Sequence, residues 1–261
     1  MSLISLKTIQ LRVFASILMI LAFACGGNED NDSPLIFAAA SLSDVLIEVS
    51  EEYETSTGDS VKFSFGGSIA LANQVAQLGA PADGVFLVGD GPVEILRADD
   101  RVDGETDSHY SNTLVVVGST DENENLNLGD LVSDPSRIAI ADPELAPAGV
   151  FAREYFTSVG KWTDLENSII RTLDVRAALA TVESGNADFA LVYRTDVADN
   201  DSVSVVMEIT EGYTPIKYSP LGVRGAKRIE SAEQFLEFTV SDQAAVAIFE
   251  RHGFSLVSSS P

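Results

Sequence analysis

The chain has 261 residues, of which 45% are apolar, and this is enough for one large domain or for two smaller lobes with separate cores. Forty acidic residues oppose 16 basic ones and give a net charge of −24, which argues against nucleic acid and anionic lipid surfaces as partners. An anion site in such a chain has to work through local dipoles, because the overall charge repels anions.

The first 24 residues have the pattern of a secretory signal peptide. Lys7 and Arg12 precede an apolar run over 13–24, which is too short to span a bilayer of ~30 Å as a helix. Two modes of cleavage remain open. Residues 22–24, Ala-Phe-Ala, fit the small-x-small rule of ordinary signal peptidase, and "LAFAC" is similar to a bacterial lipobox, whose cysteine becomes the lipidated first residue.

Cys25 favours lipidation because it is the only cysteine in the chain and because a polar, glycine-containing segment follows it. It also excludes an internal disulfide. We therefore expect a signal peptide over 1–24 and a flexible tether over 25–33. The expected location is the periplasm or the outer face of the cytoplasmic membrane, with a lipid anchor at Cys25.

Short β-rich apolar runs then alternate with helical patterns, which predicts an α/β fold with mostly parallel strands. Strands are expected at 34–40, 60–65, 84–89, 112–119, 137–143, 188–194, 202–209 and 216–225, and helices at 42–58, 68–79, 92–99, 148–160, 174–185, 231–241 and 243–253. Two open sheets side by side are predicted to bind a ligand at the carboxyl ends of their strands. The runs over 112–119 and 216–225 are expected to cross between the lobes.

Ser41, Ser68 and Ala148 each stand where a strand pattern ends and a helix pattern begins. Asp174 and Val175 begin a further helix without a long strand directly before them. Helix starts leave unpaired backbone N–H groups and a partial positive charge. Several of them in one cleft make an anion site without lysine or arginine.

These positions also have structural interpretations. Ser41 with Asp44 fits the S-x-x-D capping pattern, and the glycine pair before Ser68 fits a tight turn in which the backbone approaches a ligand closely. Asp174 is expected to cap the helix that follows it. Tyr193 ends a buried strand, where a structural tyrosine is an ordinary finding.

The sequence contains few residue patterns that are typical of catalytic sites. His109 and His252 have no metal-ligand spacing, and no G-x-S-x-G elbow occurs. No catalytic residue, metal ligand or cofactor is therefore predicted. A secreted serine hydrolase with Ser41 or Ser68 as nucleophile remains an alternative, although it lacks a histidine base at a suitable place.

The order and spacing of several motifs over about 35–254 carry a resemblance to a known family. The motifs are "FAAASLSDVL", "FGGSIALANQV", "GAPAD", "IADPELAPAG", "DVRAALATVESGNADFALVY" and "IFERHGF". The chain resembles the periplasmic molybdate-binding proteins of bacterial ABC importers. This resemblance implies a type II periplasmic-binding-protein fold with two α/β lobes, each a mostly parallel sheet flanked by helices, and the ligand in the interlobe cleft. The expected lobes are 34–112 with 219–261, and 113–218.

The resemblance also implies the site and the partners. Molybdate, and tungstate as well, would be held by hydrogen bonds without direct metal ligation, and a monomeric receptor would deliver the oxyanion to the permease of an ABC importer. The implied contacts are Ser41, Ser68, Ala148, Val175 and Tyr193. Two hydroxyls with their backbone N–H groups, two further N–H groups and one phenol supply seven donors. A receptor for another oxyanion such as sulfate, and a sensor that serves no transporter, remain alternatives.

Overall fold

The computed structural model describes residues 33–103, 108–119 and 137–257. The chain divides into two compact units, Met1–Ser33 and Pro34–Pro261, and the description below concerns the second. The predicted signal peptide, Cys25 and nearly all of the predicted tether lie outside the described residues. None of the helices within the described ranges is long and apolar enough to cross a membrane.

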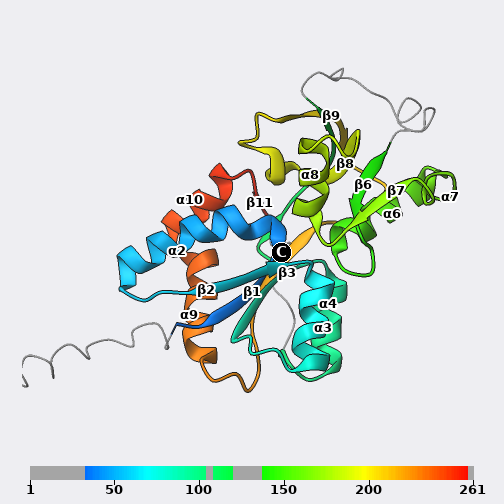
Figure 1. Cartoon of the computed structure of the whole chain (residues 1–261). Helices are drawn as coiled ribbons and strands as arrows, with labels where there is room; N and C mark the ends of the chain where they lie inside the picture. The colour runs from blue at the N-terminus through cyan, green and yellow to red at the C-terminus, as the bar shows by residue number, and fades with distance from the viewer. Residues whose placement is uncertain (1–32, 104–107, 120–136, 258–261) are drawn as a thin grey trace, which may run out of the picture. The chain divides into compact units, whose positions relative to one another are not determined.

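The first sheet contains six strands in the order β11-β4-β10-β3-β1-β2. Figure 1 labels β1, β2, β3 and β11 of this sheet. The strands are β1 (Leu35–Ala39), β2 (Lys62–Gly66), β3 (Gly84–Val88), β4 (Tyr110–Ser111), β10 (Lys217–Gly222) and β11 (Ser255–Leu256). β1 pairs in parallel with β2 and β3, whereas β10 runs antiparallel to β3 and β4.

Helices cover both faces of this sheet, because its strands alternate apolar side chains between the two faces. Ile36 and Ala38 join the core formed with α2 (Ser43–Thr57), α9 (Ile229–Ser241) and α10 (Gln243–Arg251), whereas Phe37 joins the core formed with α3 (Ser68–Leu78) and α4 (Asp90–Ala98). Figure 1 shows α3 and α4 next to each other beside β3. All three strand residues are buried.

The second sheet contains five strands in the order β7-β6-β8-β5-β9. They are β5 (Leu114–Ser119), β6 (Ile138–Ala141), β7 (Ile169–Thr172), β8 (Phe189–Tyr193) and β9 (Val203–Ile209). Among the described residues of this half of the chain, the helices are α6 (Pro147–Ser158), α7 (Trp162–Leu165) and α8 (Val175–Glu183). Two short 3-10 helices, η2 (Ala40–Leu42) and η3 (Arg194–Val197), follow directly on β1 and β8.

The predicted α/β two-lobe class is confirmed, and both sheets are mixed rather than mostly parallel. The reason is the chain path: β5 enters the second sheet antiparallel to β8 and β9, and β10 returns antiparallel to β3. The chain thus passes between the sheets after β4 and again before β10. The residue limits of the lobes, 34–112 with 219–261 and 113–218, stay a prediction.

Candidate functional site: a pocket at the starts of four helices

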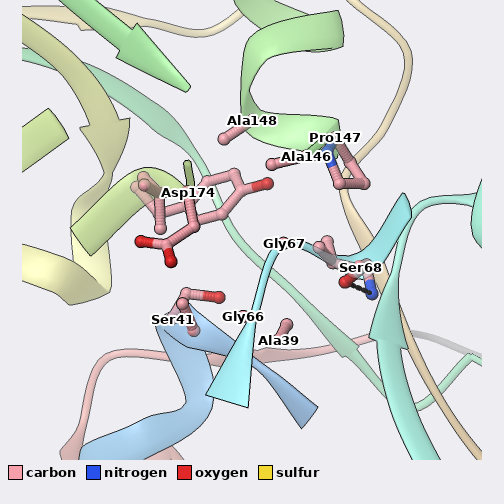
Figure 2. Close-up of a pocket in the computed structure, with 13 residues that line it drawn as sticks. Ala39, Ser41, Gly66, Gly67, Ser68, Ala146, Pro147, Ala148 and Asp174 are labelled. Carbon is pink, nitrogen blue, oxygen red and sulfur yellow. Dashed lines mark hydrogen bonds between the residues drawn. The ribbon is translucent and has the colours of Figure 1, made fainter. Parts of the chain in front are cut away.

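One small pocket brings together all five positions that the sequence singles out as anion contacts. It is lined by Ala39, Ala40, Ser41, Gly66, Gly67, Ser68, Val88, Ala146, Pro147, Ala148, Asp174, Val175 and Tyr193. The empty space within it is about 200 Å³, which includes space open to solvent. Figure 2 shows Ser41, Gly67, Ser68, Ala148 and Asp174 around this common space. The size fits a compact ligand of few atoms.

Ser41 does not cap a helix, so the capping interpretation is wrong. It lies within the 3-10 helix η2, and α2 begins only at Ser43, with Leu42 as an N-cap that makes no side-chain hydrogen bond. The Ser41 Oγ instead lies 3.1 Å from the hydroxyl of Tyr218 on β10. Ser41 is 2% exposed, so its hydroxyl is held between this tyrosine and the pocket.

Ser68 is the first residue of α3 and is buried. Its Oγ accepts a hydrogen bond from the backbone N–H of Val88, at 3.2 Å, drawn as a dashed line in Figure 2. Because an oxygen that accepts this bond still carries its own hydrogen, the hydroxyl of Ser68 is available to donate. The N–H of Ser68 is in the first turn of the helix and therefore has no partner within it.

Ala148 contributes a backbone group rather than a side chain. Pro147 is the first residue of α6, where its missing N–H costs nothing, and Ala148 is the second. Gly149 lets this first turn pack against the end of β6, since an added Cβ would lie 2.0 Å from the Ala141 carbonyl oxygen. The "PAG" motif thus brings an unpaired N–H to the carboxyl end of a strand.

Val175 begins α8, and Asp174 is its N-cap, as the sequence predicts. The Asp174 Oδ1 accepts a hydrogen bond from the N–H of Ala177 at 3.0 Å. The N–H of Val175 lies in the first turn and has no intrahelical partner. A short strand, β7, directly precedes this helix start, which the sequence did not indicate. The fourth helix start therefore has the same strand–turn–helix arrangement as the others.

Tyr193 is the last residue of β8 and is 1% exposed. Among the described residues, its hydroxyl is a buried polar atom without a hydrogen-bond partner. Burial, with smaller contributions from Tyr218 and Asp196, raises the pKa of this phenol well above its ordinary value of 10.0, so the hydroxyl keeps its proton. Buried hydroxyl groups in proteins are normally hydrogen-bonded, so this phenol can donate to an acceptor bound in the pocket.

The polarity of the pocket is that of a donor cage. Among the lining residues of the described chain, none is Lys, Arg or His, and Asp174 is the one with a charge. The sequence did not place this carboxylate at the pocket, although its capping role was predicted. Donors therefore come from hydroxyls and helix N-termini, whose partial positive charge favours an anion.

Gly67 marks a close approach, and what approaches it is backbone of the other lobe rather than a ligand. An added Cβ would lie 2.5 Å from the Leu145 carbonyl oxygen and 3.0 Å from that of Leu173. Next to it, the N–H of Ala70 on α3 donates to the same Leu145 carbonyl, at 3.0 Å. The segments that carry Ser68 and Ala148 are thus in direct contact beside the pocket.

A chain of charges also connects the two lobes. Arg176 on α8 contacts Asp44 on α2, with Nη2 2.7 Å from Oδ2, and its Nε lies 2.9 Å from Oδ1 of Asp196. The other oxygen of Asp196 accepts from the backbone N–H of Tyr193, at 2.9 Å. Burial raises the pKa of Asp196 from 3.8 to about 6, against the opposing effect of Arg176. The interactions of Arg176 and Asp196 thus connect α2 of one lobe with Tyr193 of the other.

Nucleophilic catalysis has little support in this geometry. Ser41 contacts Tyr218, and Ser68 contacts the Val88 backbone, so over the described part of the chain neither serine has a histidine base. His252 instead lies 2.7 Å from Glu48. The described residues contain no group of three or more His, Cys, Asp or Glu that could hold a metal ion.

A two-lobed α/β chain with a small donor pocket between its lobes has the architecture of a periplasmic binding protein. A family described as bacterial extracellular solute-binding protein matches residues 34–255, and the chain belongs to this family. Members of a solute-binding family bind ligands.

Relatives cover most of the chain. YvgL of Bacillus subtilis, named as an ABC transporter substrate-binding lipoprotein, is 30% identical over 259 residues, 95% of this chain and 98% of that protein. The molybdate-binding protein ModA of Escherichia coli is 32% identical over 248 residues, 90% of this chain and 95% of ModA. The periplasmic molybdate-binding protein of Azotobacter vinelandii shares the fold, with a TM-score of 0.76 at 22% identity over 86% of this chain and 100% of that chain.

Proposed function

We propose that the protein captures molybdate and tungstate in the pocket described above and delivers them to an ABC importer. The observation that carries the proposal is the buried Tyr193 hydroxyl, which has no partner in the described chain and lines a pocket of helix N-termini and hydroxyls. The names of the relatives, a molybdate-binding protein and a transporter substrate-binding lipoprotein, point to the same ligand and the same kind of partner.

The chemistry of the ligand matches the donor set. A doubly charged tetrahedral oxyanion only accepts hydrogen bonds, and each contact to a charged acceptor is worth ~1.5–3 kcal/mol. A buried charge without such contacts costs several kcal/mol, so full satisfaction is required. We assign the contacts to the hydroxyls and N–H groups of the two serines, to two further N–H groups and to the phenol. The residues are Ser41, Ser68, Ala148, Val175 and Tyr193.

Selectivity among oxyanions follows from donors and size. Phosphate near neutral pH keeps a proton that needs an acceptor, and none of the five assigned contacts supplies one. Sulfate is fully ionised, but its shorter bonds to oxygen would stretch contacts shaped for molybdate. The expected order is molybdate and tungstate, then sulfate, then phosphate. Asp174 is the one lining carboxylate; its Oδ1 accepts from the N–H of Ala177, and its Oδ2 is the acceptor that the phosphate proton would have to use.

A calorimetric titration of the purified protein against the four anions tests the proposal. Tight binding of molybdate and tungstate supports it, and preference for sulfate would make the protein a receptor for another oxyanion. Binding of phosphate as tight as that of sulfate would assign an acceptor role to Asp174, and Asp174→Asn should then abolish the phosphate binding selectively. No binding of any of the four would overturn the proposal.

We further propose that Cys25 carries a lipid and anchors a monomeric receptor at the outer face of the cytoplasmic membrane. The lone cysteine after an apolar signal motivates this, and one relative is named a lipoprotein. Cys25→Ala should move the protein from the membrane fraction to the soluble fraction. Wild-type protein that is fully soluble and unlipidated would instead indicate ordinary signal cleavage. The receptor needs no cofactor and no catalytic residue.

A further inference from the structure

A chain of hydrogen bonds reaches the pocket from the two segments that pass between the sheets. Asn112 lies between β4 and β5, and its Nδ2 donates to Oγ1 of Thr195 at 2.7 Å and to the hydroxyl of Tyr218 at 3.2 Å. Tyr218 lies on β10, and its hydroxyl is 3.1 Å from the Oγ of Ser41. The direction of these bonds decides where the hydrogen of Ser41 points.

The amide of Asn112 sets the direction. The backbone N–H of Thr113 donates to Oδ1 of Asn112, at 2.9 Å, so the amide oxygen faces Thr113. The NH₂ group must then face Thr195 and Tyr218, and an amide nitrogen can only donate. The Tyr218 oxygen is therefore an acceptor for Asn112.

Tyr218 in turn has one hydrogen to give. It is fully buried, and burial raises the pKa of its phenol above the ordinary value, so the hydroxyl remains protonated. Ser41 is the oxygen within reach that is not already a donor to it, and Tyr218 donates there. The Ser41 oxygen accepts from Tyr218, and its own hydrogen is left to point elsewhere. Since Ser41 lines the pocket, this hydrogen is available for a hydrogen bond to an anion bound there.

We propose that Tyr218, oriented by Asn112, is a positioning residue that keeps the Ser41 hydroxyl as a donor toward the bound anion. This inference rests on the proposed function, because the anion is the acceptor it serves. It adds a role for two residues that do not line the pocket, and it joins both inter-sheet segments to the ligand.

A double-mutant cycle on molybdate affinity tests the proposal, with Tyr218→Phe, Ser41→Ala and the two combined. Tyr218→Phe removes the orienting bond and should weaken binding about two- to tenfold, the equivalent of one ordinary hydrogen bond. In the Ser41→Ala background the same substitution should leave affinity unchanged. Equal losses in both backgrounds would mean that Tyr218 acts through packing, and this overturns the proposal.

Asn112→Asp provides a second test, because it replaces the amide donor to Tyr218 with a carboxylate acceptor and changes the shape of the side chain little. The new carboxylate accepts the hydrogen of Tyr218, so Ser41 has to donate to the Tyr218 oxygen instead of to molybdate. A larger loss than with Tyr218→Phe is expected, and part of it should disappear when Ser41 is alanine. A loss that is the same in both backgrounds is charge repulsion alone, and it counts against the proposal.

Tyr110→Phe is the matched control. Tyr110 is another fully buried tyrosine of the same sheet, and its hydroxyl donates to the Thr239 carbonyl at 2.6 Å, outside the pocket. It should lower stability without changing molybdate affinity. The wild-type titration tests the proposed function, whereas the coupling between Tyr218→Phe and Ser41→Ala tests this inference, so the two fail separately. The same double-mutant cycle, measured on the unfolding free energy without ligand, tests whether the hydrogen bond between Tyr218 and Ser41 forms.

Discussion

Tyr193→Phe should weaken ligand binding without lowering the stability of the protein. The hydroxyl of Tyr193 is buried, and no described residue forms a hydrogen bond with it, so its removal breaks no hydrogen bond within the described chain. An unsatisfied buried hydroxyl costs ~1–3 kcal/mol. Its removal should therefore leave the free energy of unfolding unchanged or raise it, whereas most substitutions in a core lower it.

The affinity for molybdate should fall. In the proposed site the phenol supplies one hydrogen bond to a charged acceptor, worth ~1.5–3 kcal/mol, which corresponds to about 10- to 150-fold in Kd. Calorimetric titration gives the Kd of both proteins. Urea denaturation with and without molybdate gives the stabilisation by ligand, which should shrink by the same free energy at saturating concentrations.

Tyr213→Phe is the control in the same lobe. The hydroxyl of Tyr213 donates to the Ile209 carbonyl at 2.9 Å and accepts from the N–H of Leu114 at 3.2 Å. Its loss should lower stability by ~1 kcal/mol and leave affinity unchanged. If Tyr193→Phe behaves like this control, Tyr193 is a structural tyrosine and does not contact the ligand.

Three further outcomes are expected. Gly67→Ala should weaken molybdate binding more than about tenfold, because the added methyl group meets backbone of the other lobe. Gly91→Ala is the control, since its methyl group meets nothing within 4 Å, and it should leave binding unchanged. Equal Kd values for the two variants would refute the close approach at Gly67. Asp44→Asn removes the partly exposed ion pair between Asp44 and Arg176. It should weaken molybdate binding less than about fivefold and remove part of the salt dependence of that binding. An unaffected Kd at low salt would contradict this. The raised pKa of Asp196, about 6 against 3.8, means that its neutral form favours the native state below about pH 4 and that this advantage is lost as the pH rises through 6. Denaturation of the wild type against Asp196→Asn between pH 4 and 7 should therefore show a relative loss of about 3 kcal/mol, and a constant difference would refute it.

The long elements of the fold are predictable from the sequence, and the shortest are not. The helix and strand patterns at 42–58, 68–79 and 112–119 correspond to α2, α3 and β5. The strands β4 and β11 contain two residues each, too few for any periodicity. They are strands only because they pair with each other and with β10, far away in the sequence.

The candidate site divides in the same way. Helix starts at Ser68, Ala148 and Val175 follow from local patterns, and the resemblance adds Tyr193. The bond partner of Ser41 does not follow, because Tyr218 is 177 residues away and only the sheet order brings it near. The S-x-x-D pattern at Ser41 misleads because the intervening 3-10 turn shifts the start of α2 by one residue, from 42 to Ser43.

The absence of cationic side chains from the described pocket lining has a consequence for the kinetics of capture. An approaching dianion meets the long-range repulsion of a chain with a net charge of −24, and it meets attraction only within reach of the N–H and O–H groups. At 0.1 M ionic strength the Debye length is only ~10 Å, so salt weakens the distant repulsion and leaves the buried contacts untouched. The association rate constant is then expected to rise with ionic strength, the reverse of anion sites built from arginine and lysine. In such a receptor, salt speeds capture.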